Sequence, residues 1–311
     1  MIIKKRSQPL VLQILESLNV RTVLSASEKK DYANQLKGYQ GEVLFDAYLE
    51  NLQFECLIIN DLRLKESGNM IQIDSLILTS DVIYLYEIKN YSGSYDYKDD
   101  ALHGRLDFVI ADPLTQIHKT QPFLHNLVRK LGSKKVIKSQ VIFIEPDFYL
   151  YDLPRDKPFL FANQLTREFD SMEKRHSAIK KSDKRLANQL GQLHITDYRP
   201  IDLPEYDYSN LKKGITCPNC FSFDHINTRK TRICTCCGYK ETISEAIKRS
   251  TENFHLLFPE VSITKRLIYD WCGKAYDEQR VQRVLRRTYI SHGSYRSTYY
   301  EQIPRDYSNG E

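Results

Sequence analysis

The stretch QIDSLILTSDVIYLYEIKNYSG, residues 72–93, contains the strongest indication of the fold of this protein. It has two apolar runs rich in β-branched and aromatic residues, separated by a turn at Ser80 and Asp81, and this pattern predicts two adjacent β-strands. Asp74, Glu87 and Lys89 lie within these runs, where strand positions are usually buried. A buried carboxylate or amine costs free energy unless it is paired or used. These residues therefore form either a structural ion pair or part of a metal site.

The segments around this stretch predict one α/β (α+β) domain. Residues 30–51 place apolar side chains at a helical period, and three apolar runs of strand composition follow between residues 54 and 90. Residues 112–132 can form a second helix, and the run SQVIFIE, residues 139–145, is a further buried strand. The order helix, three strands, helix and strand predicts an α/β domain that ends near residue 170.

The charged residues of the two central strands can meet on one face. Glu87 and Lys89 are two residues apart, so a strand places both side chains on the same side. Asp74 lies in the preceding strand, where a cross-strand position close to Glu87 is reasonable. A lone E-x-K pattern is most often an ion pair at a strand end. Here the ordered set of Glu42 on a helix, Asp74, twelve further residues and then E-x-K favours a metal site, because Mg²⁺ prefers oxygen ligands.

Four short motifs carry a family resemblance: GYQGE at residues 38–42, QID at 72–74, EIKNYSG at 87–93 and DPLTQ at 112–116. On these motifs the sequence resembles the PD-(D/E)XK nuclease superfamily and, more narrowly, the nuclease-related domain (NERD) family, over about residues 30–145. The resemblance implies a restriction-endonuclease-like αβββαβ core and metal-dependent hydrolysis of phosphodiester bonds.

The resemblance also implies roles for five residues. Glu42, Asp74 and Glu87 would surround a catalytic Mg²⁺ or Mn²⁺ ion. Lys89 is the lysine of the motif, and Gln116 matches a glutamine at the start of the second helix that contacts substrate or backbone. We therefore expect Glu42, Asp74, Glu87, Lys89 and Gln116 to be catalytic.

Five of the seven cysteines lie within residues 217–237. Cys217 and Cys220 form one C-x2-C pair and Cys234 and Cys237 form a second, thirteen residues later. Each pair can direct two thiolates at one tetrahedral centre, so the spacing predicts a structural Zn²⁺ site in a small zinc ribbon. Cys236 has the wrong spacing for a knuckle and is a spare thiol. The basic insert between the pairs either contacts nucleic acid or is a solvated hairpin.

The C-terminal segment predicts two helices followed by a β-hairpin, with Gly273 in the turn between the helices. A short helix-turn-helix with a basic second helix, about 277–288, and a wing-like hairpin resembles winged-helix DNA-binding modules. A solvated arginine face is the alternative. The candidate nucleic-acid-binding residues are Arg280, Arg283, Arg286, Arg287 and Arg296.

Length and composition suit a protein of two or three domains. The chain has 311 residues, 41% of them hydrophobic, and a net charge of +5, which permits a polyanionic partner without requiring one. It has no apolar run of about 18 residues and no recognisable signal peptide, so we expect a cytoplasmic location and no membrane partner. The expected organisation is an N-terminal helical extension at 1–29, a NERD nuclease domain at 30–170, a helical segment and linker at 171–213, a zinc ribbon at 214–242 and a helix-turn-helix or winged-helix-like module at 243–311.

Two functions remain in competition. The first is a Mg²⁺-dependent deoxyribonuclease whose zinc ribbon and C-terminal module bind DNA, in DNA processing or in defence against foreign DNA. The second is a non-catalytic nucleic-acid-binding or regulatory protein that retains a nuclease fold. A serine or cysteine hydrolase is disfavoured, because the sequence has no G-x-S-x-G elbow. RNA as the substrate and a homodimer both stay open.

Overall fold

The computed structural model describes residues 1–66, 68–105, 108–196, 198–199 and 203–303 and divides the chain into two compact units. Unit 1 comprises Met1–Leu10 and Ala33–Ile201, and unit 2 comprises Val11–Tyr32 and Asp202–Glu311. The extension expected at residues 1–29 is divided between them, because its first strand belongs to unit 1 and its helix to unit 2. In the described part of the chain, no helix is both long and apolar enough to cross a membrane.

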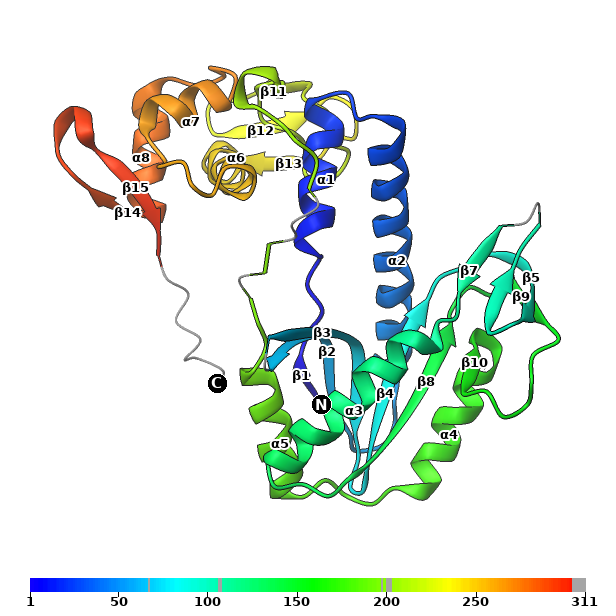
Figure 1. Ribbon diagram of the computed structural model, residues 1–311. Helices are drawn as coiled ribbons and strands as arrows, with labels where there is room; N and C mark the ends of the chain where they lie inside the picture. Colours follow the sequence, from blue (N-terminus) through cyan, green and yellow to red (C-terminus); the bar gives the residue numbers. More distant parts are fainter. Residues whose placement is uncertain (67, 106–107, 197, 200–202, 304–311) are drawn as a thin grey trace. The chain divides into compact units, whose positions relative to one another are not determined.

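The core of unit 1 is a six-stranded mixed sheet with the strand order β1, β2, β3, β4, β8 and β10 (Figure 1). Strands β2, β3 and β4 are antiparallel, whereas β8 runs parallel to both β4 and β10, and β1 runs parallel to β2. The strands are β1 (Ile2–Lys4), β2 (Leu57–Glu66), β3 (Asn69–Leu78), β4 (Val82–Lys89), β8 (Val136–Phe143) and β10 (Phe159–Phe161). The long β2–β3–β4 meander and the parallel β8 confirm the predicted αβββαβ core.

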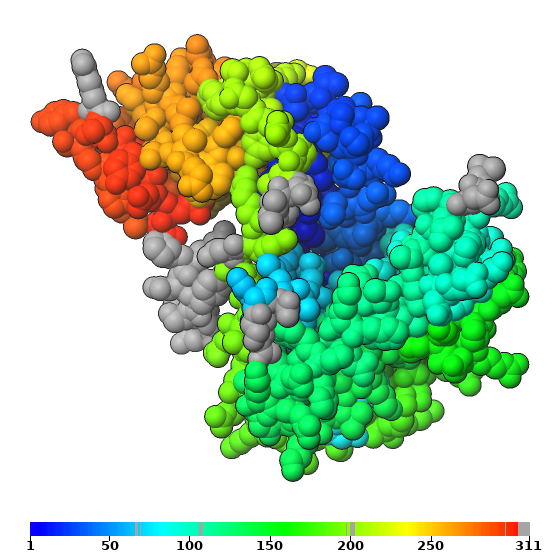
Figure 2. Space-filling view, viewed as in Figure 1, coloured from blue at the N-terminus to red at the C-terminus, as the bar shows by residue number. Residues whose placement is uncertain are grey.

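Helices cover both faces of this sheet, because its central strands are apolar on both sides. The helices are α2 (Ala26–Glu50), α3 (Leu114–Lys130), α4 (Leu165–Arg175) and α5 (Lys181–Gln192). Leu124 of α3 and Leu186 of α5 pack in one core cluster with Leu85 of β4, and Phe45 of α2 and Phe169 of α4 pack in the other cluster. Figure 1 shows α3 crossing one face of this sheet, and in Figure 2 its atoms, in teal to green, form the outer surface on that side.

The backbone of β2 is irregular at Asp61. Asp61 has a φ of 50°, in the left-handed region that non-glycine residues rarely adopt. Leu57 and Ile59 before it and Leu62 and Leu64 after it all lie in the same core cluster, so the alternation of faces shifts by one residue at Asp61. A carboxylate is thereby buried in the middle of an apolar strand.

A second, four-stranded sheet in unit 1 has the order β7, β6, β5 and β9. Its strands are β5 (Gly93–Lys98), β6 (Ala101–His103), β7 (Val109–Ala111) and β9 (Phe148–Tyr151). Leu102 and Phe148 pack into the main core cluster of unit 1. Since β5 begins four residues after β4 ends, this sheet lies next in sequence to the E-x-K motif.

Unit 2 contains the ribbon, the helices and hairpin that follow it, and the first helix of the chain. Its elements are α1 (Leu10–Arg21), η2 (Tyr208–Asn210), β11 (His225–Asn227), β12 (Thr231–Cys234), β13 (Lys240–Thr242), α6 (Ile243–Leu257), α7 (Lys265–Trp271), α8 (Glu278–Thr288), β14 (Tyr289–His292), η3 (Tyr295–Ser297) and β15 (Tyr299–Gln302). Strands β11 to β13 form an antiparallel sheet, and β14 pairs with β15. Helix, turn, helix and hairpin follow in the order that the sequence predicts.

Arg21 joins α1 to the core of unit 2. Its guanidinium lies 4.0 Å from the ring centroid of the fully buried Trp271 and donates hydrogen bonds to the carbonyl oxygens of Lys212 (2.7 Å) and Gly214 (3.1 Å). Burial lowers the pKa of Arg21 to about 10, so the group remains charged at neutral pH. The N-terminal helix is therefore an integral part of the C-terminal unit.

Candidate functional site

The ladder between β3 and β4 stops where the acidic residues begin. Ser75 and Tyr86 form the last paired residues at this end, and beyond them the backbone N–H of Ile88 donates to Oδ2 of Asp74 at 2.8 Å. The Asp74 carboxylate thus takes the place of a backbone acceptor. Asp74 is 8% exposed and Glu87 is 4% exposed. The strands separate at this point and present two buried carboxylates in the chain order that the motif requires.

Lys89 links the E-x-K strand to the second helix. Its Nζ donates to Oε1 of Glu87 at 2.8 Å, as expected for side chains two residues apart on a strand, and also to Oε1 of Gln116. Gln116 lies in the first turn of α3, whose start is held by a hydrogen bond from the N–H of Leu114 to Oδ1 of Asp112 (3.0 Å). The structure therefore brings Glu87, Lys89 and Gln116 into one connected group.

A glycine and an asparagine bring α2 against the end of β4. Asn90 donates from Nδ2 to the carbonyl oxygen of Lys37 at 2.7 Å. A Cβ atom on Gly41 would lie 2.5 Å from Cβ of Asn90, so only glycine allows the two elements to approach so closely. Glu42, the next residue of the helix, is positioned by this contact. At Gly38 the space is open, since a Cβ atom added there would have no neighbour within 4 Å in the described part of the chain.

This difference between the two glycines gives a direct test. Gly41→Ala is expected to lower the free energy of unfolding by about 1–3 kcal/mol, because the new methyl group forces α2 and β4 apart. Gly38→Ala is the matched control in the same helix, and it should raise stability by up to about 1 kcal/mol through helix propensity. Urea unfolding of both variants provides the comparison. Equal effects of the two substitutions would contradict the close contact at Gly41.

Arg6 is the residue of this site that the sequence did not reveal. It follows β1, and its side chain is 2% exposed. It donates to Oε2 of Glu42 at 2.5 Å, to both carboxylate oxygens of Asp46 at 2.9 and 3.0 Å, and to the carbonyl oxygen of Asp74 at 2.9 Å. The sole sequence signal is a run of three cations, Lys4 to Arg6, directly after an apolar pair. Such a run gives no indication of which side chain is buried.

The buried surroundings of the site disfavour the charged forms of its acidic residues. Burial raises the pKa of Glu42 to about 8 and that of Glu87 to about 8, and the charge of Asp74 adds to both shifts. Burial also raises the pKa of Asp74, although the hydrogen bond from Ile88 opposes that shift. For Lys89, burial favours the neutral amine, but the adjacent Glu87 carboxylate outweighs it and holds the pKa of Lys89 above its usual value. Glu42 and Glu87 therefore favour the protonated form near neutral pH, and a cation bound beside them would favour the charged form.

The donor set suits a hard divalent cation, because three carboxylates supply only oxygen ligands. Among the described residues, the group close enough together to hold a metal ion as it stands is formed by four cysteines, and Glu42, Asp74 and Glu87 are not among them. Two of these carboxylates contact Arg6 and Lys89. The chemistry of the site thus fits Mg²⁺ or Mn²⁺.

Four cysteines of unit 2 form a second candidate metal centre. The Sγ atoms of Cys217, Cys220, Cys234 and Cys237 all lie within 4.8 Å of one another. Gly238, with a φ of 74°, donates its N–H to the carbonyl oxygen of Cys234 at 3.0 Å and so closes the second turn. Cys236 is exposed and is not part of the group. A four-cysteine cluster on two turns is typical of a zinc ribbon.

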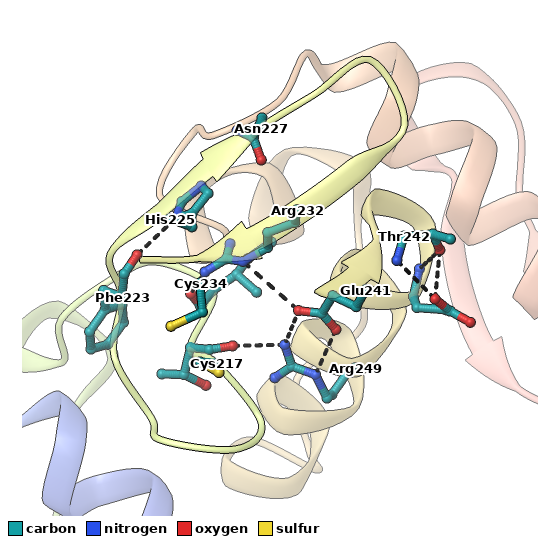
Figure 3. A network of polar contacts seen from close by, with 12 residues as sticks. Cys217, Phe223, His225, Asn227, Arg232, Cys234, Glu241, Thr242 and Arg249 are labelled. Carbon is teal, nitrogen blue, oxygen red and sulfur yellow. Dashed lines mark hydrogen bonds and ion pairs between the residues drawn. The ribbon is translucent and has the colours of Figure 1, made fainter. Parts of the chain in front are cut away.

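A polar network fixes the ribbon to α6 (Figure 3). Arg232, 2% exposed, donates to the carbonyl oxygen of Ile215 and lies 3.8 Å from Glu241. Arg249 of α6 donates to the same glutamate at 2.8 Å and to the carbonyl oxygen of Thr216 at 2.7 Å. Arg232 is therefore a structural residue. Arg232 is thus neither solvated nor available to nucleic acid, unlike Arg229 and Lys230 of the same insert, which are exposed.

The arginines of α8 lie opposite its apolar face. Val281, Val284 and Leu285 are buried, and the N–H of Arg280 donates to Oδ1 of Asp277 at 2.7 Å at the start of the helix. Of the five candidate arginines, Arg283, Arg286 and Arg287 are exposed and Arg280 is partly buried, and the side chain of Arg296 lies outside what the structure describes.

Arg280 also joins α8 to the ribbon. It donates from Nη2 to the carbonyl oxygen of Arg229 at 3.1 Å, and Tyr276 donates to Oδ1 of Asn227 at 2.9 Å. Arg229 and Lys230 are exposed in the loop between β11 and β12. The loop of the ribbon and the start of α8 are thus held together within unit 2.

A mixed sheet between helices, with Asp74, Glu87 and the E-x-K lysine where two strands separate, defines a nuclease-like α/β domain. Residues 37–144 match the model of one family, the nuclease-related domain (NERD). The chain therefore carries a nuclease-related domain, which indicates a nuclease-related function and confirms the resemblance based on the four motifs. No curated protein and no solved structure matches the chain.

Proposed function

We propose that this protein is a metal-dependent deoxyribonuclease that hydrolyses phosphodiester bonds in DNA. The observation that carries the proposal is the connected group of Glu87, Lys89 and Gln116 beside the buried Asp74, inside the segment that matches the nuclease-related domain. Four groups on two strands and a helix converge there, whereas an ordinary surface ion pair would need only two exposed side chains.

Each residue of the site has a distinct role in this proposal. Glu42, Asp74 and Glu87 would hold Mg²⁺ or Mn²⁺, which neutralises the negative charge that builds on a phosphate during hydrolysis. Lys89 places a positive charge next to the attacked phosphate, and Gln116 fixes the direction of the Lys89 ammonium through its amide oxygen.

DNA is the proposed partner of unit 2. Arg280, Arg283 and Arg287 lie at positions i, i+3 and i+7 and so form one stripe along α8. The stripe starts at the ribbon loop, where Arg280 contacts the backbone of Arg229 and Lys230 is exposed. A continuous row of cations from two elements suits the phosphate backbone, and affinity should therefore fall steeply with salt. Zn²⁺ at the four cysteines would be structural and would hold the ribbon loop in place.

The test is cleavage of supercoiled plasmid and of linear DNA by the purified protein with EDTA, Mg²⁺ or Mn²⁺. Lys89→Met is expected to lower the cleavage rate at least about 100-fold, since it removes a positive charge preorganised beside the phosphate. Lys138→Met is the matched control, because Lys138 is an exposed lysine on the neighbouring strand β8. Cleavage that persists in Lys89→Met, or that EDTA leaves unchanged, would contradict the proposal.

One observation favours a second function. Glu42 contacts Arg6 and Glu87 contacts Lys89, as in a site whose carboxylates are balanced by side-chain cations and need no metal ion. In that case the protein binds nucleic acid without cutting it. Salt-sensitive DNA binding by the wild-type protein, without cleavage in either metal, would support this second function.

A further inference from the structure

Arg6 is surrounded by acceptors that belong to the proposed metal site. Its side chain is 2% exposed, and its donors contact Glu42, Asp46 and the backbone of Asp74. An arginine on a solvated face would expose its guanidinium to water. Arg6 is instead a fixed positive charge between α2 and β3, the two elements that carry the first two acidic residues of the site.

The geometry of the guanidinium shows how Arg6 is held. Nε and Nη2 donate to the two carboxylate oxygens of Asp46 at 2.9 and 3.0 Å, which is the bidentate arrangement that arginine favours. Nη1 is then directed at Glu42, one helical turn before Asp46, and Nη2 also reaches the Asp74 carbonyl oxygen. Asp46 thus anchors the arginine, and the arginine holds Glu42.

The contact with Glu42 involves only one carboxylate oxygen, Oε2. Glu42 Oε1 lies outside this contact. A carboxylate held through one oxygen has its rotation restricted while the other oxygen can still bind a cation. Hydrogen-bonding partners behind a ligand commonly set its orientation in this way, and their loss costs about 10- to 100-fold in metal affinity.

We propose that Arg6 is a positioning residue of the nuclease centre, which clamps the Glu42 carboxylate against β3 so that Glu42 can bind a divalent cation together with Asp74. This inference rests on the proposed function. It assigns to the segment before α1 a part in the active site, although that segment lies far from every motif in the sequence.

A competing explanation of the Arg6 contacts is that they only dock the N-terminal segment onto the sheet and do not position Glu42. Lys4, two residues before Arg6, donates to the carbonyl oxygens of Asn60 (2.9 Å) and Asp61 (2.7 Å), and so also ties the segment to β2. Within the described residues, Lys4 has no hydrogen bond to Glu42, Asp46 or Asp74. Lys4→Met therefore loosens the segment without touching the clamp and serves as the control.

The experiment measures Mn²⁺ binding to the full-length protein by calorimetry, together with kcat and KM for DNA cleavage. Arg6→Lys keeps the charge but lacks the planar fork that binds both carboxylate oxygens of Asp46. It should weaken Mn²⁺ binding about 10-fold and lower kcat while KM stays unchanged. Asp46→Asn removes the carboxylate that anchors Arg6 but keeps the arginine itself. It should also lower both the Mn²⁺ affinity and kcat. Lys4→Met should leave the Mn²⁺ affinity as it is.

Several results would overturn the inference. Wild-type affinity in both Arg6→Lys and Asp46→Asn would show that the clamp does not position Glu42, and an equal loss in Lys4→Met would assign the effect to docking of the segment. If Arg6→Ala binds Mn²⁺ more tightly than wild type, Arg6 competes with the metal ion. In each case a wild-type protein that binds Mn²⁺ and cuts DNA keeps the proposed function intact. A wild-type protein that neither binds Mn²⁺ nor cuts DNA would contradict both the inference about Arg6 and the proposed function.

Discussion

Glu87→Gln is expected to abolish metal-dependent DNA cleavage and, at the same time, to stabilise the metal-free protein above pH 8. Cleavage should fall by a factor of at least about 1,000, since the substitution removes a charged ligand from the proposed metal site and weakens the acceptor of Lys89. Loss of activity with a gain in stability is typical of a site whose charges serve function, because such sites carry a cost in folding.

The expected gain in stability follows from the pKa of Glu87. Burial and the charge of Asp74 raise that pKa in the folded state to about 8, above the value of about 4.3 for an unfolded glutamate. A raised acidic pKa means that the metal-free protein is most stable below the unfolded pKa and loses stability as the pH rises toward and through the folded pKa. Since one pKa unit is worth about 1.4 kcal/mol, the difference between pKa values of about 4.3 and about 8 corresponds to on the order of 5 kcal/mol. The wild-type protein loses this stabilisation by pH 9, and the neutral glutamine does not.

Thermal unfolding from pH 5 to pH 9, with EDTA or with Mg²⁺, measures this effect. In EDTA the wild-type Tm should fall between pH 5 and pH 9 more than the Tm of Glu87→Gln. Added Mg²⁺ should raise the wild-type Tm at pH 9 and leave that of the variant nearly unchanged. Glu145→Gln, at a partly exposed glutamate just after β8, is the control. A variant less stable than wild type at pH 9 would show instead that Glu87 and Lys89 form a structural ion pair.

The second large effect that we expect is the loss of the Zn²⁺ ion proposed for the cysteine cluster. Cys220→Ala should lose the bound Zn²⁺ and the order of residues 214–242, because these few residues bury little apolar surface and structural zinc sites contribute about 10–16 kcal/mol of apparent binding free energy. The ribbon loop then no longer holds Arg280, so DNA affinity should fall at least about 10-fold.

The control for this prediction is the spare thiol. Cys236→Ser should retain stoichiometric zinc and wild-type DNA affinity, because Cys236 is exposed and lies outside the four-cysteine group. Zinc content by mass spectrometry and DNA binding by fluorescence anisotropy provide the two readouts. Loss of zinc in Cys236→Ser but not in Cys237→Ser would show that Cys236, and not Cys237, is the fourth ligand. Unchanged DNA affinity in zinc-free Cys220→Ala would show that the folded ribbon does not contribute to DNA binding.

The cysteine group and the E-x-K group were predictable because their members are close in the chain. Two residues on one strand share a face whatever the rest of the fold does, and the contact of Lys89 with Glu87 follows from that. Similarly, each C-x2-C turn brings two thiols together locally, and the choice of Cys234 and Cys237 needs only the spacing. Local geometry also placed the turn at Gly273, whose φ is 68°, and the helix that follows it.

Residues that meet only through the tertiary fold could not be found this way. Arg6 contacts Glu42 across 36 positions of sequence, and its depth of burial depends on where β1 joins the sheet. Arg232 looked like its neighbour Lys230 in sequence, yet it is buried against Glu241 and Ile215. A cation in a short run carries no local signal of whether it is solvated or enclosed.

The order of strands and helices in the nuclease-related domain, its acidic motif and the cysteine pairs could all be read from the amino-acid sequence, because periodicity and short spacing are properties of a local segment. Three other facts required the folded chain: α1 belongs to unit 2, Gly41 and not Gly38 must be glycine, and Arg6 lies at the acidic site. They depend on which surfaces pack together, and the packing partners of a residue are determined by the fold of the whole domain rather than by any single stretch of sequence.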